Sequence, residues 1–307
     1  DMDENGIATL VAALASSVAS DAQARAQADA FLAAASTQNG TAFALLRIAA
    51  DDGLDMGVRQ SASIYFKNMC AKSWAAREHL PTAWVMSASD KANARGAALD
   101  AIARTPAKVR SQLVEAVRVM VHHDFPEQWP EVASQVLQGL EEANAAHPER
   151  LCGTVLVLHA LCRKYEFKHS SERADIEQVI AVVFPKLLSV LKALIAYGTP
   201  NEALEELKKA ICKTYWSATY LHVGPSLQQE DTYREWMSAF HTVITTPVHI
   251  EGISDPTDKM ELRHWPWWKT KKWALHNVNR QFTRYGNLKN AQSDSKELAV
   301  MYRKSYA

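Results

Sequence analysis

The residues best suited to acid–base or metal chemistry lie together at one point of the chain. His122, His123 and Asp124 are consecutive, and imidazole and carboxylate groups bind metals or transfer protons. Because consecutive side chains at a helix end point in different directions, these three cannot hold one metal ion jointly. Histidine near a helix C-terminus also interacts favourably with the helix dipole. The triplet therefore predicts a helix end, and no catalytic centre.

Sequence motifs of known enzyme classes give no support for catalysis. The chain has no G-x-x-x-x-G-K-[ST], no G-x-S-x-G and no H-E-x-x-H. The four cysteines stand singly in apolar stretches without the C-x-x-C spacing of zinc and redox sites; they are Cys70, Cys152, Cys162 and Cys212. We interpret them as buried small hydrophobic residues in a reducing compartment. We expect no enzyme activity, no metal and no cofactor.

The charge balance argues against a general nucleic-acid binder. Lys plus Arg and Asp plus Glu are both 34, which gives a net charge of zero, and such a chain lacks the field that attracts phosphates. Residues 7–20 resemble a signal peptide, but acidic residues precede them where a basic region is needed. Residues 179–197 are apolar, but Pro185, Lys186 and Lys192 interrupt them. We therefore expect a soluble intracellular protein without direct contact with nucleic acid or membrane.

Apolar residues recur with the helical period along almost the whole chain, and short turns separate the periodic segments. The expected helices are 4–17, 22–36, 41–50, 55–73, 90–104, 106–122, 128–145, 148–165, 171–197, 201–220, 232–245, 267–285 and 293–306. The second helices of successive pairs begin near 21, 55, 106, 149, 201 and 267, at intervals that scatter around the roughly 40–47 residues of a HEAT or armadillo unit. The sequence predicts an all-α, right-handed superhelical solenoid of about six HEAT-like helical hairpins.

One junction between two expected helices has a distinctive pattern. Residues 109–121 place four apolar side chains on one helical face. Asp124 then offers a side-chain acceptor at the next helix start, Pro126 restricts the backbone, and Trp129 is expected to fill the gap between the helices. An ordinary corner in some other helical-repeat protein is the alternative interpretation of this segment taken by itself.

A second distinctive segment is rich in tryptophan and lysine. An apolar stripe is expected from Trp268, Trp273, Leu275, Val278 and Phe282. It is flanked by five cations, Lys269, Lys271, Lys272, Arg280 and Arg284. A packed stripe with solvated lysines is the favoured interpretation. The alternative is a contact surface for an acidic partner or a cation–π brace.

Four segments resemble one protein family. Residues 110–113 (RSQL) with 124–130 (DFPEQWP), and residues 58–69 (VRQSASIYFKNM), resemble motifs of importin-β-type nuclear transport receptors, with Ser61 where alanine is more usual. Residues 163–173 (RKYEFK, then ER) and 265–286 (WPWWKTKKWALH, then FTRYG) resemble segments of the subgroup of importins seven and eight. The chain is identified as a member of this karyopherin subgroup. It resembles an amino-terminal fragment, because its last expected helix keeps an apolar face without a cap.

The resemblance implies an organisation and a function. Residues 1–73 would be the importin-β amino-terminal domain, and 74–307 further HEAT-like repeats of a chain truncated at its C-terminal end. The expected function is nuclear import: binding of the small GTPase Ran in its GTP form releases cargo. The other implied partners are basic cargo proteins and Phe-Gly nucleoporins, with shuttling between cytoplasm and nucleus. The implied Ran-binding residues are Arg59, Lys67, Asn68, Arg110 and Gln112.

Alternatives remain open at this stage. A static HEAT scaffold without a nucleotide-dependent switch, or an exportin that binds cargo together with Ran-GTP, would show the same helical pattern. The side chains of Lys67 and Asn68 could instead join adjacent repeats through hydrogen bonds to the backbone, and the same alternative holds for Arg110 and Gln112.

Overall fold

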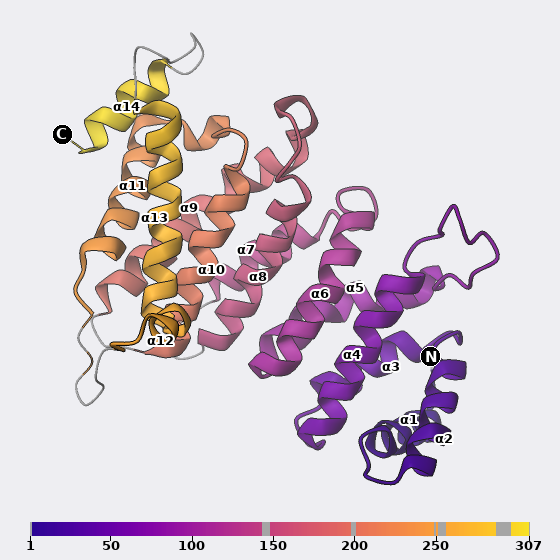
Figure 1. The fold of residues 1–307 in the computed structure, drawn as a ribbon. Helices are drawn as coiled ribbons and strands as arrows, with labels where there is room; N and C mark the ends of the chain where they lie inside the picture. Colours follow the sequence, from indigo (N-terminus) through magenta and orange to yellow (C-terminus); the bar gives the residue numbers. More distant parts are fainter. Residues whose placement is uncertain are drawn as a thin grey trace. The chain divides into compact units, whose positions relative to one another are not determined.

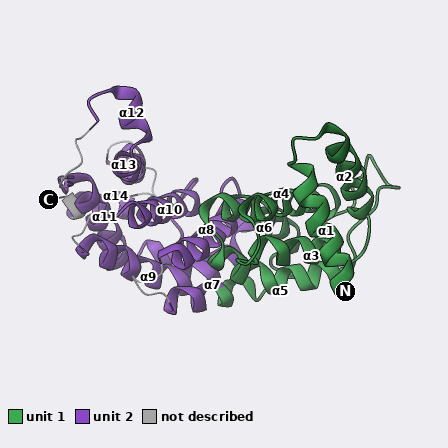
Figure 2. Ribbon diagram, turned by 90° about the horizontal axis from the view of Figure 1, so that it is seen from below, with its two compact units in different colours: residues 1–135 green, residues 136–307 purple. Residues whose placement is uncertain are grey.

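The computed structural model describes residues 2–142, 148–197, 201–248, 250, 256–286 and 296–306. These residues form helices and connecting turns (Figure 1), and within them the only β-type pairing is an isolated bridge between Arg77 and Leu80. The chain divides into two compact units, residues 1–135 and 136–307 (Figure 2). The all-α prediction is confirmed for the described part of the chain.

The first unit contains three helical pairs. They are α1 (Glu4–Ser17) with α2 (Ala22–Ala35), α3 (Thr41–Ala50) with α4 (Met56–Ser73), and α5 (Ala88–Arg104) with α6 (Ala107–Asp124). The first helices α3 and α5 pack against each other, and so do the second helices α4 and α6. This pairing produces two layers, in which a helix is buried by its partner and by the equivalent helix of the next pair.

The second unit repeats this arrangement. Its helices are α8 (Pro148–Lys164), α9 (Ala174–Ala196), α10 (Glu202–Ala218), α11 (Glu230–Thr245), α12 (Lys259–His264), α13 (Pro266–Tyr285) and α14 (Lys296–Tyr306), and α7 (Val132–Glu141) crosses the boundary between the units. One layer is α8, α10 and α13 side by side, and α9 packs against α11 in the other. The short α12 and the last helix α14 both contact α13.

Helix starts follow the capping residues that the sequence offers. The side chains of Asp21 and Asn201 accept hydrogen bonds from backbone N–H groups in the first turns of α2 and α10, as N-cap residues do. Pro106 stands one position before the first residue of α6, outside the helix. The helix α12 was not expected, and it lies between the helices predicted at 232–245 and 267–285. Gly198 and Pro200 follow the helix predicted at 171–197, and these residue types are expected to end it; both lie outside the described residues.

The junction after α6 differs from its prediction. Asp124 is the last residue of α6, and its carboxylate does not cap α7: it accepts from Trp74 Nε1 at 2.9 Å and pairs with Arg95 Nη1 at 2.5 Å. The backbone N–H groups of Gln128 and Trp129 both bond the Asp124 carbonyl oxygen. The turn contains a cis Phe125–Pro126 bond, and α7 begins after it at Val132, four residues later than predicted. Trp129 is buried, as predicted.

The helix α9 is long and apolar enough to cross a membrane by length and composition alone. In this structure 44% of that apolar window is buried, and α9 packs against α10 and α11. Its buried side chains are Ile176, Val179, Ile180, Val183, Phe184, Leu187, Leu188, Leu191 and Leu194. A long apolar helix that buries one face on its neighbours is typical of the core of a folded helical domain.

Three of the four cysteines are buried, as predicted. Burial raises the pKa of Cys162 and of Cys212 to about 12, and it also raises the pKa of Cys70. These thiols therefore stay protonated at neutral pH and behave as small apolar groups. Cys152 is half-buried, so the prediction of a fully buried side chain is wrong for this residue.

Two buried aspartates connect helices of the first unit that lie far apart in sequence. Both carboxylate oxygens of Asp90 accept from the Gly40 N–H, at 2.9 and 2.8 Å. Gly40 has φ 87°, a left-handed conformation in which glycine is favoured. Asp124 joins the C-cap of α4 (Trp74), α5 (Arg95) and α6. A buried carboxylate needs such partners, because removal of a charge from water is costly unless it is compensated.

We expect Asp124→Ala to lower the free energy of unfolding of the first unit by about 3 kcal/mol, because it leaves the partly buried Arg95 charge without its partner. Trp74→Phe removes one neutral donor and should cost about 1 kcal/mol. Urea unfolding followed by circular dichroism measures both values. Equal, small losses in the two variants would contradict the central role of Asp124.

Candidate partner-binding surface

The five residues predicted to bind Ran fall into two structurally different groups. Arg59 and Arg110 are buried, each with a relative exposure of 6%. Arg59 Nε donates to the Ala49 carbonyl oxygen at 3.2 Å, and Arg110 Nη2 donates to that of Thr105 at 2.7 Å. Each arginine is the fourth residue of a second helix and reaches back to the end of the first helix of its own pair. The two guanidinium groups therefore close the hairpins α3–α4 and α5–α6.

A related arrangement occurs at the first hairpin, where the acceptors lie in the turn that follows the end of α1 at Ser17. Arg25 is the fourth residue of α2, and its Nη1 donates to the carbonyl oxygens of Ala19 and Ser20, both at 2.7 Å. The last carbonyls of a helix lack partners within the helix, and a guanidinium supplies several donors in a fixed geometry. An arginine at this position is thus a repeated structural feature of the first unit.

Lys67, Asn68 and Gln112 form the second group. Asn68 is exposed, and Lys67 and Gln112 are half-buried. None of the three side chains makes a hydrogen bond to another described residue. The alternative in which they join adjacent repeats through hydrogen bonds to the backbone is therefore not observed, and their polar ends remain available to solvent or a partner.

The structure does not gather the five residues into one cluster. Arg59, Arg110 and Gln112 lie near the starts of α4 and α6, whereas Lys67 and Asn68 lie farther along α4. Eight residues separate Arg59 from Lys67, which corresponds to about 12 Å along a helix. Lys67, Asn68 and Gln112 therefore lie at separate points along α4 and α6, two helices that pack side by side.

In the second unit, polar side chains of α13 bond the backbone of α10. Thr270 Oγ1 donates to Glu205 O at 3.0 Å, Asn277 Nδ2 to Cys212 O at 2.9 Å, and Arg280 Nη1 to Trp216 O at 3.1 Å. Arg284 Nη1 likewise donates to Thr219 O at 3.0 Å, just after the end of α10. These residues were missed as contacts between repeats, although their spacing of seven, three and four places them on one helical face.

This arrangement corrects the prediction of a buried apolar stripe on α13. Trp268, Leu275 and Phe282 are 44%, 53% and 59% exposed. The buried side chains of α13 are instead Thr270, Ala274, Asn277, Gln281 and Tyr285. The buried face of α13 is therefore mostly polar. Of the predicted stripe, Trp273 and Val278 are half-buried, whereas Trp268, Leu275 and Phe282 recur every seven positions on a face open to solvent.

The cation–π brace, which was part of the alternative interpretation of this segment, is present in the second unit. The Arg280 guanidinium lies over the Trp216 ring and 4.4 Å from the centroid of Tyr220. Burial lowers the pKa of Arg280 to about 10, which leaves it charged at neutral pH. Lys213 Nζ lies 5.2 Å from the centroid of Trp273. These contacts give α10 and α13 a second, electrostatic connection beside their hydrogen bonds.

Another buried arginine connects two hairpins of the second unit. Arg173, 1% exposed, donates to the Tyr165 carbonyl oxygen at 2.8 Å and to that of Ala218 at 2.7 Å. It also pairs with Glu177. Arg173 belongs to the segment that resembles importins seven and eight, and its position gives that segment a structural role.

A buried serine, histidine and glutamate lie together, but their geometry does not suit catalysis. Ser217 Oγ is 3.3 Å from His159 Nε2 and 3.3 Å from Glu166 Oε2. In a catalytic triad the carboxylate orients the histidine, whereas here Glu166 bonds the serine. All three side chains are 4% exposed or less, so a substrate has no access to them. Within the described residues no group of side chains fits a metal ion.

Comparison with known proteins gives consistent results. Residues 28–104 match the family described as the importin-beta N-terminal domain. The chain is 36% identical over 263 residues to the importin beta-like SAD2 homolog of Arabidopsis thaliana and 32% identical over 268 residues to importin-8 of Mus musculus. Each alignment covers 86% of this chain, and the chain spans about a quarter of the length of these relatives (25% and 26%).

A solved structure gives the fold. The exportin Cse1 in its cargo-free, cytoplasmic state superposes with a TM-score of 0.73 at 17% identity, covering 97% of this chain and 34% of that one. This likeness confirms the prediction of a HEAT-repeat solenoid.

We expect Arg110→Ala to lower the free energy of unfolding by about 2 kcal/mol, because it leaves the buried Thr105 carbonyl without its donor and removes packed aliphatic surface. Gln112→Ala, two residues away on the same helix, should change it by less than about 0.5 kcal/mol. Thermal and urea unfolding of the two variants provide the measurement. Similar losses of unfolding free energy in the two variants would contradict the assignment of a structural role to Arg110 and not to Gln112.

Proposed function

Because this chain belongs to the importin-β-like karyopherins, in the group of importins seven and eight, we propose that its first unit binds the small GTPase Ran in the GTP form. The observation that carries the proposal is the match of residues 28–104 to the importin-beta N-terminal domain, since this region includes α4 with its polar positions Lys67 and Asn68. The protein would act as a nuclear import receptor that shuttles between cytoplasm and nucleus.

Within this proposal the two groups of predicted residues have different roles. Lys67, Asn68 and Gln112 are the side chains that would contact Ran, because their polar ends are not used inside the described structure. Arg59 and Arg110 would act as positioning residues, since their guanidinium groups already hold the hairpins closed. Loss of either arginine would displace the helix that carries the contact residues.

The proposed mechanism is an exchange of partners. Cargo binds in the cytoplasm, and Ran-GTP displaces it in the nucleus; basic cargo proteins and Phe-Gly nucleoporins are the further proposed partners. Such an exchange requires a difference in affinity between the two forms of Ran, and each tenfold preference corresponds to about 1.4 kcal/mol. A stack of helical pairs suits this task, because small rotations between neighbouring pairs add up along the stack.

The first test is a pull-down of this chain with Ran loaded with GDP or with a non-hydrolysable GTP analogue. Selective retention of the GTP form is the expected result. Equal binding of both forms, or no binding, would favour a static scaffold instead. Addition of a very basic protein such as a histone then tests the direction of transport. Displacement of the histone from this chain by Ran-GTP indicates import, and binding of both proteins together indicates export.

We expect Lys67→Ala combined with Asn68→Ala to weaken Ran-GTP binding about tenfold with an unchanged melting temperature. A matched control combines Gln178→Ala with Lys186→Ala on α9, and it should leave the affinity unchanged. Calorimetric titration and thermal unfolding measure the two quantities. A large loss of thermal stability in the first variant would assign a structural role to the pair.

A further inference from the structure

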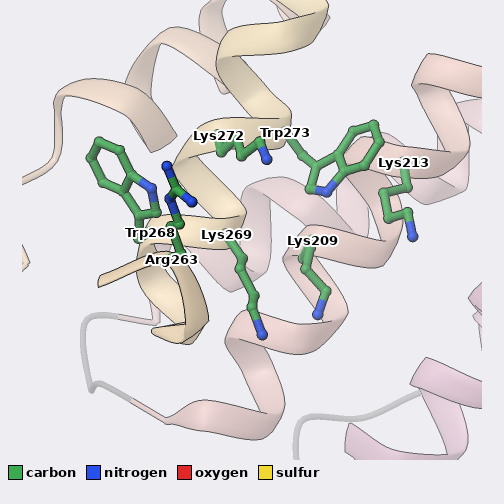
Figure 3. A pocket seen from close by; sticks show the side chains of 7 residues that line it. All are labelled: Lys209, Lys213, Arg263, Trp268, Lys269, Lys272 and Trp273. Atoms are coloured by element: carbon green, nitrogen blue, oxygen red, sulfur yellow. The ribbon is translucent and has the colours of Figure 1, made fainter. Parts of the chain in front are cut away.

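A strongly basic pocket lies on the second unit, at α10, α12 and α13 (Figure 3). It has a volume of about 540 Å³ and is lined by Lys209, Lys213, Arg263, Trp268, Lys269, Lys272 and Trp273. Five of these seven side chains are cations, and within the described part of the chain no carboxylate lines the pocket. The net charge of the whole chain is zero. The excess of positive charge is therefore local to this pocket.

The cations are only partly compensated by the surrounding protein. Lys209 forms an ion pair with Glu206, and Lys213 lies over the Trp273 ring. Figure 3 shows the side chains of Lys209 and Lys269 extending from different helices toward the same side of the pocket. Like charges in a confined site repel one another, and an anion bound between them relieves this repulsion.

The walls of the pocket are held in place. Thr270 and Asn277 tie α13 to the backbone of α10 on either side of Trp273, and Trp273 packs edge-to-face on Trp216 at 5.9 Å. Because the two helices are fixed by hydrogen bonds, the lysines project from a rigid frame. A rigid frame lowers the entropic cost of binding.

We propose that this basic pocket binds an extended acidic segment of a partner protein. Lys209 and Lys213 are four residues apart on α10, a separation of about 6 Å along the helix. Alternate side chains of an extended peptide are about 6.6 Å apart, so carboxylates at every second position match the spacing of these two helix positions. Trp268, which is 44% exposed, adds an apolar surface at the edge for an aliphatic or aromatic side chain of the segment.

Single-stranded nucleic acid fits the pocket less well. Its binding sites combine a basic groove with aromatic rings on which successive bases stack. Here the Lys213 ammonium group occupies a face of Trp273, and the ring edge meets Trp216 and His276. Only Trp268 offers an open ring, which is insufficient for successive bases. The proposal rests on contacts within the second unit and is independent of Ran binding by the first.

The test is fluorescence anisotropy of labelled probes with the 307-residue chain. The probes are a peptide of about twelve residues with alternating Glu and Gly, the corresponding Lys and Gly peptide, and an oligouridylate of equal length. We expect the acidic peptide to bind, the basic peptide not to bind, and the affinity to fall several-fold when salt rises from about 50 to about 200 mM. Dissociation constants above about 1 mM for the acidic peptide would overturn the proposal.

A charge-matched pair of variants locates the binding. Lys269→Gln combined with Lys272→Gln should weaken the acidic peptide about tenfold, while Lys72→Gln combined with Lys108→Gln, on exposed lysines of the first unit, should change it less than about twofold. Equal losses of affinity in both pairs of variants would indicate non-specific electrostatic attraction and would refute the proposed binding site. Tighter binding of oligouridylate than of the acidic peptide would assign the pocket to nucleic acid instead.

Discussion

Hydrogen bonds from buried side chains to the backbone of another segment set the register of this structure. Apolar burial drives the helices together, but it is non-directional and permits sliding. A few hydrogen bonds fix how the helices are aligned. Asp90 accepts from the Gly40 N–H, and Arg110 donates to the Thr105 carbonyl oxygen. Arg173 donates to the carbonyl oxygens of Tyr165 and Ala218, and Asn277 donates to that of Cys212. Each bond would leave a buried polar group without a partner if the helices shifted by one residue, and such a group costs about 1–3 kcal/mol.

The fold could be predicted from the sequence because helical periodicity and capping residues are local signals. The bounds of α3 coincide with the prediction, and Asp21 and Asn201 cap the helices that they precede. The error at the junction after α6 has a non-local cause. Asp124 had the residue type of a helix cap, but Trp74 and Arg95, 50 and 29 residues away, determine where its carboxylate bonds. Long-range partners of this kind leave no periodic signal in the sequence.

The candidate site was harder to predict, because residue type does not separate a contact residue from a structural one. Arg59 and Lys67 are both cations on α4, yet Arg59 is buried and donates to a carbonyl oxygen, whereas Lys67 is half-buried and makes no hydrogen bond to a described residue. On α13 the tryptophan and leucine residues suggested the buried face, whereas the hydrogen-bonding capacity of α10 favours threonine and asparagine there. The lysines of α13 were visible as a cluster in the sequence. Their position in one pocket with the lysines of α10 was not.

The bonds between α13 and α10 also imply an asymmetry in how the two helices tolerate mutation. Every acceptor on α10 is a main-chain oxygen, at Glu205, Cys212, Trp216 and Thr219. Because all amino acids possess that oxygen, these acceptors do not depend on the side chains of α10, although the Trp216 ring has its own contacts with Arg280 and Trp273. The donors on α13 have no such freedom. A substitution of a donor on α13 therefore removes a hydrogen bond between the two helices, whereas a substitution of the acceptor residue on α10 does not.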